Sequence, residues 1–184
     1  MAVQTRSRVP WRIVGWGGAV ALLAAPFLAM RVGNVDVNWS LGDFIAAALM
    51  LAVVGGAFEL VVKASGSWAY RGGVVLALAG ALLTTWVNLA VGIVGSENSP
   101  ANLWFFGALA IGLSGAVVAR FRARGMSVVM LLTAVALWLA FAIASLSPTD
   151  EPYVRHSVEF AGTSIFALIL LGSALLFRKA ARKS

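Results

Sequence analysis

Six apolar stretches, each close to the length of a membrane-spanning helix, constrain this chain more than any other feature. Such a helix needs about 20 mostly apolar residues, because each residue adds about 1.5 Å across a hydrocarbon core about 30 Å thick. The stretches cover residues 13–30, 41–62, 72–94, 101–119, 126–146 and 160–177. Of all residues, 61% are hydrophobic and 11% are charged, whereas soluble domains carry about 25% charged residues. We therefore expect an all-α integral membrane bundle of six transmembrane helices.

Short polar turns separate the six stretches, so no linker is long enough to divide the chain. We therefore expect a single polytopic transmembrane domain over residues 1–184. The first stretch could instead be the core of a signal peptide, but such cores usually contain about 7–15 apolar residues. Met30 and Arg31 also interrupt the small-residue pattern of a cleavage site, which favours a retained span.

The basic residues predict the orientation of the helices, because Lys and Arg are enriched in cytoplasmic loops. Of the 14 Lys and Arg residues, all except Arg31 and Arg155 fall in the two termini and in the second and fourth turns. Every acidic residue except Glu59 falls on the other side. This alternation predicts three helical hairpins with both termini in the cytoplasm. It argues against a nucleic-acid partner, since the basic residues do not gather on one face.

Helix-start signals agree with this orientation. Ser40 and Asp43 have the spacing of a capping box, and Ser99 precedes Pro100 as an N-cap serine precedes a first-turn proline. Glu159 stands near the expected start of the last helix. Acidic residues at the outer ends of these helices lie near the positive end of the helix dipole. The helix dipole and the predicted topology therefore favour the same charges at these positions.

Asn88 is the residue that topology explains least. It lies seven residues before Gly95, where the apolar run ends, and hence about 10 Å below the outer end of the expected helix. Our first interpretation is a hydrogen bond that holds a neighbouring helix, worth about 0.6 kcal/mol. The alternative is a polar pocket or solute path. This candidate polar pocket would comprise Asn88, Trp86, Glu59, Glu97 and Asn102.

Glu59 is the acidic residue that falls inside a span on the cytoplasmic half. Lys63 follows four residues later, in the order that favours an ion pair on one helix. We expect this pair to extend toward the cytoplasmic surface. The alternative is a proton or cation relay, which usually needs a second titratable group deeper in the bilayer, and the sequence offers none.

Acidic residues and the single histidine gather at the expected outer side: Asp43, Glu97, Asp150, Glu151, His156 and Glu159. In ligand type, carboxylates with His156 match a metal site. No fixed-spacing motif supports such a site, so we expect solvated turns and helix caps there. With one His and no Cys, bis-histidine haem and iron–sulfur attachment within one chain are excluded. We expect no metal, no cofactor and no catalysis.

Small residues predict close helix packing. Gly112 and Gly115 give the fourth expected helix a small face, and glycines of the third helix suggest that these two helices pack tightly. We therefore expect a non-catalytic membrane protein that acts through helix packing with itself, as a homo-oligomer, or with a membrane partner protein. The alternatives are a transporter or channel for a small solute with a polar path near Asn88, and a metal-binding or enzymatic site at the outer acidic cluster.

Four segments carry a resemblance to a known group. They are VNWSLGDF (37–44), YRGGVVLAL (70–78), WVNLAVGIVGSENSPANL (86–103) and ARFRARGM (119–126). In these segments the chain resembles an uncharacterised family of small bacterial multi-pass inner-membrane proteins, over most of the first five spans. The resemblance implies a bacterial inner-membrane location. It brings no activity, cofactor or ligand set, so it assigns no functional residue.

Overall fold

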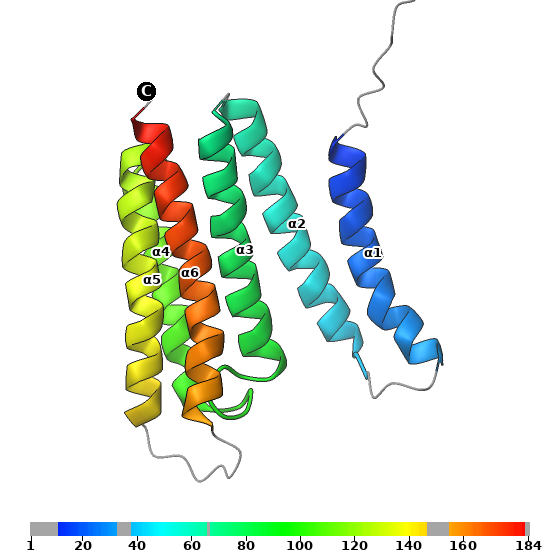
Figure 1. Cartoon of the computed structure of the whole chain (residues 1–184). Coiled ribbons are helices and arrows are strands. Elements are labelled where there is room, and N and C mark those ends of the chain that lie inside the picture. Colours follow the sequence, from blue (N-terminus) through cyan, green and yellow to red (C-terminus); the bar gives the residue numbers. More distant parts are fainter. Residues whose placement is uncertain (1–10, 33–37, 66, 147–154, 183–184) are drawn as a thin grey trace, which may run out of the picture. The chain divides into compact units, whose positions relative to one another are not determined.

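The computed structural model describes residues 11–32, 38–65, 67–146 and 155–182 (Figure 1). The described residues contain helices and no strand. The α-helices are α1 Trp11–Val32, α2 Leu41–Ala64, α3 Trp68–Ala90, α4 Leu103–Val118, α5 Ala123–Leu146 and α6 His156–Ala181, with a short 3-10 helix, η1, over Pro100–Asn102. Within this part of the chain, 6 helical segments are long and apolar enough to cross a membrane. The prediction of an all-α chain with six such helices is confirmed.

The chain divides into two compact units, residues 1–60 and 61–184, with the boundary inside α2. The first unit contains α1 and most of α2. In the second, α6 packs against both α3 and α5, and α4 packs against α5. Figure 1 shows α6 between α3 and α5. The expectation of a single domain stays a prediction.

The core of the unit 61–184 is built from large side chains seated against small ones. Phe105, Leu137 and Phe177 are fully buried. A Cβ added to Gly73 would meet the Phe177 ring at 3.1 Å, and one added to Gly80 would meet Leu170 at 2.9 Å. Glycine at these positions therefore lets α3 and α6 approach closely.

The predicted tight packing of the third and fourth helices is wrong. The glycines of α4 face α5, since a Cβ at Gly112 would meet Thr133 at 2.8 Å and one at Gly115 would meet Val129 at 2.9 Å. The glycines of α3 face α6 instead. Helices α3 and α4 make few contacts along their lengths. Adjacency in sequence therefore does not decide which helices share a small-residue face.

The turn between α4 and α5 has a strained backbone. Arg120 and Phe121 have φ values of 51° and 56°, in the left-handed region that costs a non-glycine residue about 1–2 kcal/mol. The Tyr70 hydroxyl, from the start of α3, donates a hydrogen bond of 2.6 Å to the Phe121 carbonyl. This bond satisfies a carbonyl that the turn leaves outside the helices.

Candidate functional site

Helix α3 ends at Ala90, four residues before the end of the apolar run at Val94. The predicted helical span 72–94 is therefore wrong at its outer end. Gly92 has φ +76°, and a Cβ there would collide with the Ser96 carbonyl. Gly95 also has a positive φ, of 71°. The two glycines let the chain turn back, so Asn88 lies in the last turn of α3 and not about 10 Å below its end.

Asn102 holds the folded-back segment in place. Its side-chain Oδ1 accepts hydrogen bonds from the backbone amides of Ile93 and Val94, both at 3.0 Å. Its Nδ2 donates to the Ser96 carbonyl at 2.7 Å. Because Asn102 is only 4% exposed, these bonds satisfy backbone groups that the helix end and the turn would otherwise leave buried and unpaired.

Asn88 fastens α3 to the same segment. Its Nδ2 donates to the Asn102 backbone carbonyl at 3.0 Å, and the residue is 2% exposed. The acceptor fixes the orientation of the amide, since a flipped amide would place two oxygens against each other. Oδ1 of Asn88 therefore points elsewhere, and no described residue donates a hydrogen bond to it.

Glu159, in the first turn of α6, reaches the same loop. Its Oε1 accepts a hydrogen bond from the Gly95 backbone amide at 3.3 Å. Its Oε2 lies 3.3 Å from Nδ1 of His156, which is itself 54% exposed at the surface. That Oε2 atom is buried and has no hydrogen bond of good geometry among the described residues. The carboxylate thus joins α6 to the loop after α3.

The structure shows where each residue of the candidate polar pocket lies within its own unit of the chain. Asn88 and Asn102 are in direct contact. Glu97 is exposed, and its Oε1 accepts a bond of 3.2 Å from its neighbour Asn98. Trp86 is half-buried on α3. Glu59 belongs to the other unit of the chain.

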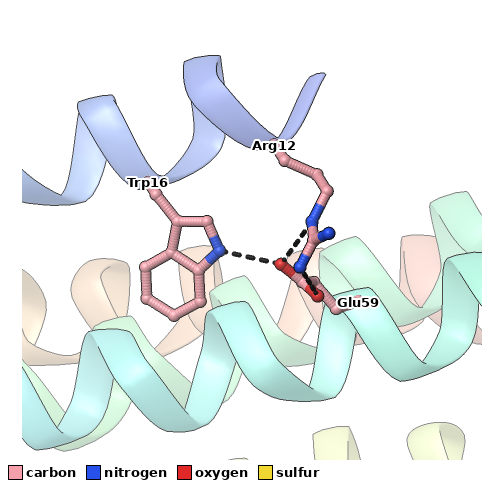
Figure 2. Close-up of polar contacts among 3 residues, drawn as sticks. All are labelled: Arg12, Trp16 and Glu59. Atoms are coloured by element: carbon pink, nitrogen blue, oxygen red, sulfur yellow. Dashed lines mark hydrogen bonds and ion pairs between the residues drawn. The ribbon is translucent and has the colours of Figure 1, made fainter. Parts of the chain in front are cut away.

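Glu59 has partners on α1 that sequence reasoning did not foresee (Figure 2). Arg12 binds the Glu59 carboxylate through two nitrogens, Nε to Oε1 at 2.9 Å and Nη2 to Oε2 at 2.7 Å. The Trp16 indole Nε1 also donates to Oε1, at 2.8 Å. The Trp16 ring lies over Gly55, where an added Cβ would approach it to 3.0 Å. The expected local partner was Lys63, whereas the bidentate bond joins two helices.

The outer acidic residues do not form a metal centre in the part of the chain that the structure describes, where no group of three His, Asp or Glu side chains could hold an ion. Asp43 is engaged in its own helix cap, since its Oδ2 accepts from the Ser40 backbone amide at 2.7 Å and from the Ser40 hydroxyl at 2.8 Å. This confirms the predicted capping box. Asp150 and Glu151 lie outside the described residues.

Two further helix starts differ in detail from their predictions. Ser99 is the N-cap residue of η1 with Pro100 in the first turn, as expected, but its side chain makes no capping hydrogen bond. The N-cap of α6 is Arg155, likewise without a side-chain bond. The sequence therefore predicted roughly where these helices begin. It did not predict how the first backbone amides of each helix are hydrogen-bonded.

Sequence reasoning missed Thr163 and Ser173, both fully buried on α6. Ser173 donates from Oγ to the Gly73 carbonyl of α3 at 2.7 Å. Thr163 Oγ1 has no hydrogen-bond partner among the described residues. One signal was available for Thr163, because it follows Glu159 by four residues and so shares its helix face.

The helices and their packing fit a multi-pass membrane protein. Large apolar side chains on the outside of α2, α4 and α5 support this, with Leu41, Val118 and Leu146 at least 77% exposed. No protein-family model matches the chain, and no curated protein or solved structure is significantly similar to it.

Proposed function

We propose that this chain is a small bacterial inner-membrane protein of three helical hairpins, with both termini in the cytoplasm. It has no catalytic role and acts by packing its helices against a second copy or a membrane partner protein. The observation that carries this proposal is that several hydroxyl side chains inside the spans of the unit 61–184 donate to backbone carbonyls of their own or a neighbouring helix.

The hydroxyl groups of the unit 61–184 illustrate this use. Ser127 of α5 donates to the Ala174 carbonyl of α6 at 2.9 Å, and Ser173 of α6 donates to α3. Thr84 and Thr133 each donate at 2.8 Å to the carbonyl four residues earlier on their own helix. Bonds between helices stabilise packing in lipid by about 0.6 kcal/mol each, whereas the bonds along one helix give buried hydroxyls a partner.

The charge distribution supports the orientation. Lys63 and Arg71 flank one turn, and Arg120, Arg122 and Arg124 occupy or border another, as the enrichment of basic residues in cytoplasmic loops requires. Arg71 also closes its turn, because its guanidinium donates to the Ser65 and Val62 carbonyls at 2.6 and 2.7 Å. The resemblance to bacterial inner-membrane proteins supports the location.

The association state of the protein tests this proposal. Full-length protein in lipid nanodiscs and in mild detergent is measured by light scattering and by chemical crosslinking in native membranes. We expect a dimer or a defined partner complex. A strict monomer in both media, with no crosslinked partner in membranes, would remove the support for this function.

A glycine variant locates the packing surface. On α1, a Cβ added to Gly17 or Gly18 would meet nothing within 4 Å. Gly17→Ile should weaken association if α1 packs against the partner through this small face. Gly107→Ile on α4, where a Cβ also meets nothing, is the matched control.

A transporter is the second candidate function, and the observation that favours it is that Asn88 Oδ1 has no hydrogen-bond partner among the described residues. In proteoliposomes, Asn88→Leu should abolish Na⁺ or K⁺ flux if Asn88 lines a conducting path. If the side chain only holds α3 to the loop, the wild-type protein should show no flux above empty liposomes. In that case the variant should lose stability alone.

A further inference from the structure

Three buried oxygen atoms near the outer end of the unit 61–184 have no hydrogen-bond partner among the described residues. They are Asn88 Oδ1 on α3, and Glu159 Oε2 and Thr163 Oγ1 on α6. Asn88 is 2% exposed and Thr163 is fully buried. Leaving a buried polar atom unpaired costs about 1–3 kcal/mol, so three such atoms in one region call for an explanation.

The helix register places these atoms at one level. Helices α3 and α6 run antiparallel, since Gly73 faces Phe177 and Gly80 faces Leu170. Two helical turns beyond Gly80, the same register brings Asn88 of α3 opposite residues 162 and 163 of α6. Glu159 lies one turn further along the same face as Thr163, and it bonds to Gly95 in the loop that follows α3.

The threonine differs from the other buried threonines of this chain. Thr84 and Thr133 each donate to the carbonyl four residues earlier, as helical threonines commonly do. The Thr163 hydroxyl makes no such bond. Its lone pairs therefore remain available, beside an amide oxygen that can only accept and a carboxylate oxygen that accepts when ionised.

The negative charge of the Glu159 carboxylate is also incompletely balanced. Glu159 has His156 as its ion-pair partner among the described residues, and an exposed histidine carries a charge only when protonated. A carboxylate whose side chain is only 12% exposed and has no permanent cation beside it is costly in a low-dielectric region. A bound cation would balance the carboxylate charge and give all three oxygen atoms a partner.

We propose that Asn88, Glu159 and Thr163 form a binding site for a small monovalent cation, with Na⁺ as the best match. Hard cations take carboxylate, amide and hydroxyl oxygens as ligands. A single carboxylate suits one positive charge, whereas Ca²⁺ requires six to eight oxygens. In secondary transporters, backbone carbonyls at interrupted helices contribute to Na⁺ sites. Here α3 ends at Ala90, and the backbone of residues 91–96 lies outside the helices.

The test is a melting experiment on the full-length protein in detergent, followed by intrinsic tryptophan fluorescence. The salts are NaCl, KCl and choline chloride at equal ionic strength. A cation that binds only the folded state raises the melting temperature with its concentration. Above the dissociation constant, we expect a rise of about 3–5 °C for each tenfold increase in NaCl, and none in choline chloride.

Matched variants assign the effect to the site. Thr163→Val removes one hydroxyl without changing the side-chain shape, and Glu159→Gln removes the charge. Both should lose most of the Na⁺-dependent shift. Thr133→Val, which deletes a buried hydroxyl elsewhere, should keep the shift even if its melting temperature falls. Should Glu159→Gln fail to fold, Thr163→Val still decides the question.

Two results would overturn the proposal. Equal melting temperatures in all three salts would mean that water, and not a cation, satisfies these oxygens. A Na⁺-dependent shift that Thr163→Val retains would place the cation elsewhere. A larger shift in KCl than in NaCl would keep the site but change its ion. The experiment reads the folded chain in any association state, so its outcome is separate from that of the crosslinking test.

Discussion

The side-chain amide of Asn88 donates a hydrogen bond of 3.0 Å to the backbone carbonyl of Asn102, fourteen residues further along the chain. One bond thus joins the last turn of α3 to the residue that enters α4. Asn102 in turn holds the loop between them through three more bonds. The two asparagines have different roles. Asn88 joins α3 to the segment, and the Asn102 side chain bonds to the backbone groups within it.

Replacing Asn102 should be more damaging than replacing Asn88. Asn102→Ala leaves the amides of Ile93 and Val94 without the side-chain oxygen that accepts from them and removes the Asn102 bond to the Ser96 carbonyl, so we expect a loss of about 3 kcal/mol or more in the free energy of unfolding. Asn88→Ala removes one bond and should cost about 1–2 kcal/mol. Hydrogen exchange of the amides at 93 and 94 provides a local measurement. Equal losses in both variants would contradict the role assigned to Asn102.

Gly92→Ala should destabilise the protein by more than about 1–2 kcal/mol, because its φ of +76° is unfavourable for alanine and the new Cβ would collide with the Ser96 carbonyl. The control is Gly107→Ala, in a helix and with open space around the new Cβ. That change should stabilise α4 by about 0.5–1 kcal/mol. Denaturation in mixed micelles measures both, and a tolerant Gly92 would show that the loop is not held as described.

The contact between Arg12 and Glu59 should be measurable as a coupling energy. Arg12→Met, Glu59→Gln and the double variant form a cycle, read by hydrogen exchange of the α1 amides, since both residues lie in the unit 1–60. We expect a coupling of about 1–2 kcal/mol, above that of an ordinary surface pair, because the bond is bidentate and Glu59 is only 14% exposed.

Trp16→Phe refines this measurement. The change removes the indole donor to Glu59 but keeps an aromatic ring over Gly55, so it should lower protection of α1 less than Glu59→Gln does. Additive effects of the Arg12 and Glu59 changes would show that the two side chains do not interact in the folded protein.

The orientation can be tested with single cysteines, because the chain contains none. A membrane-impermeant maleimide applied to intact cells should label Glu97→Cys, while Ser65→Cys and Arg122→Cys should react only after the cells are opened. Labelling of the two basic turns from outside would reverse the proposed topology.

The apolar pattern was enough to predict the helices, because spanning a bilayer demands long runs that few other structures share. The Ser40–Asp43 cap could also be predicted, because a capping box is a spacing of residues close together in the sequence. The end of α3 was misjudged because residues 91–94 are apolar yet buried in a turn, held by an asparagine eight or more residues away. Hydropathy does not distinguish a helix in lipid from a loop under protein cover.

The partners of Glu59 could not be predicted from the sequence for a related reason. Lys63 is close in sequence, and local spacing therefore favoured it. Arg12 and Trp16 lie on another helix, and their distance from Glu59 follows from how α1 and α2 pack. The same holds for Thr163, whose isolation from its own helix carbonyl depends on a side-chain orientation that no sequence pattern encodes.

The position of α6 between α3 and α5 has a consequence for biosynthesis. Helix α3 leaves the ribosome well before α6, and at about 5–20 residues per second the interval lasts about 5–20 s. Until then, the glycine face that receives Phe177 and Leu170 has no cover. Nascent chains stalled before residue 156 should therefore expose this face to chaperones and membrane proteases, which makes α6 a checkpoint for quality control.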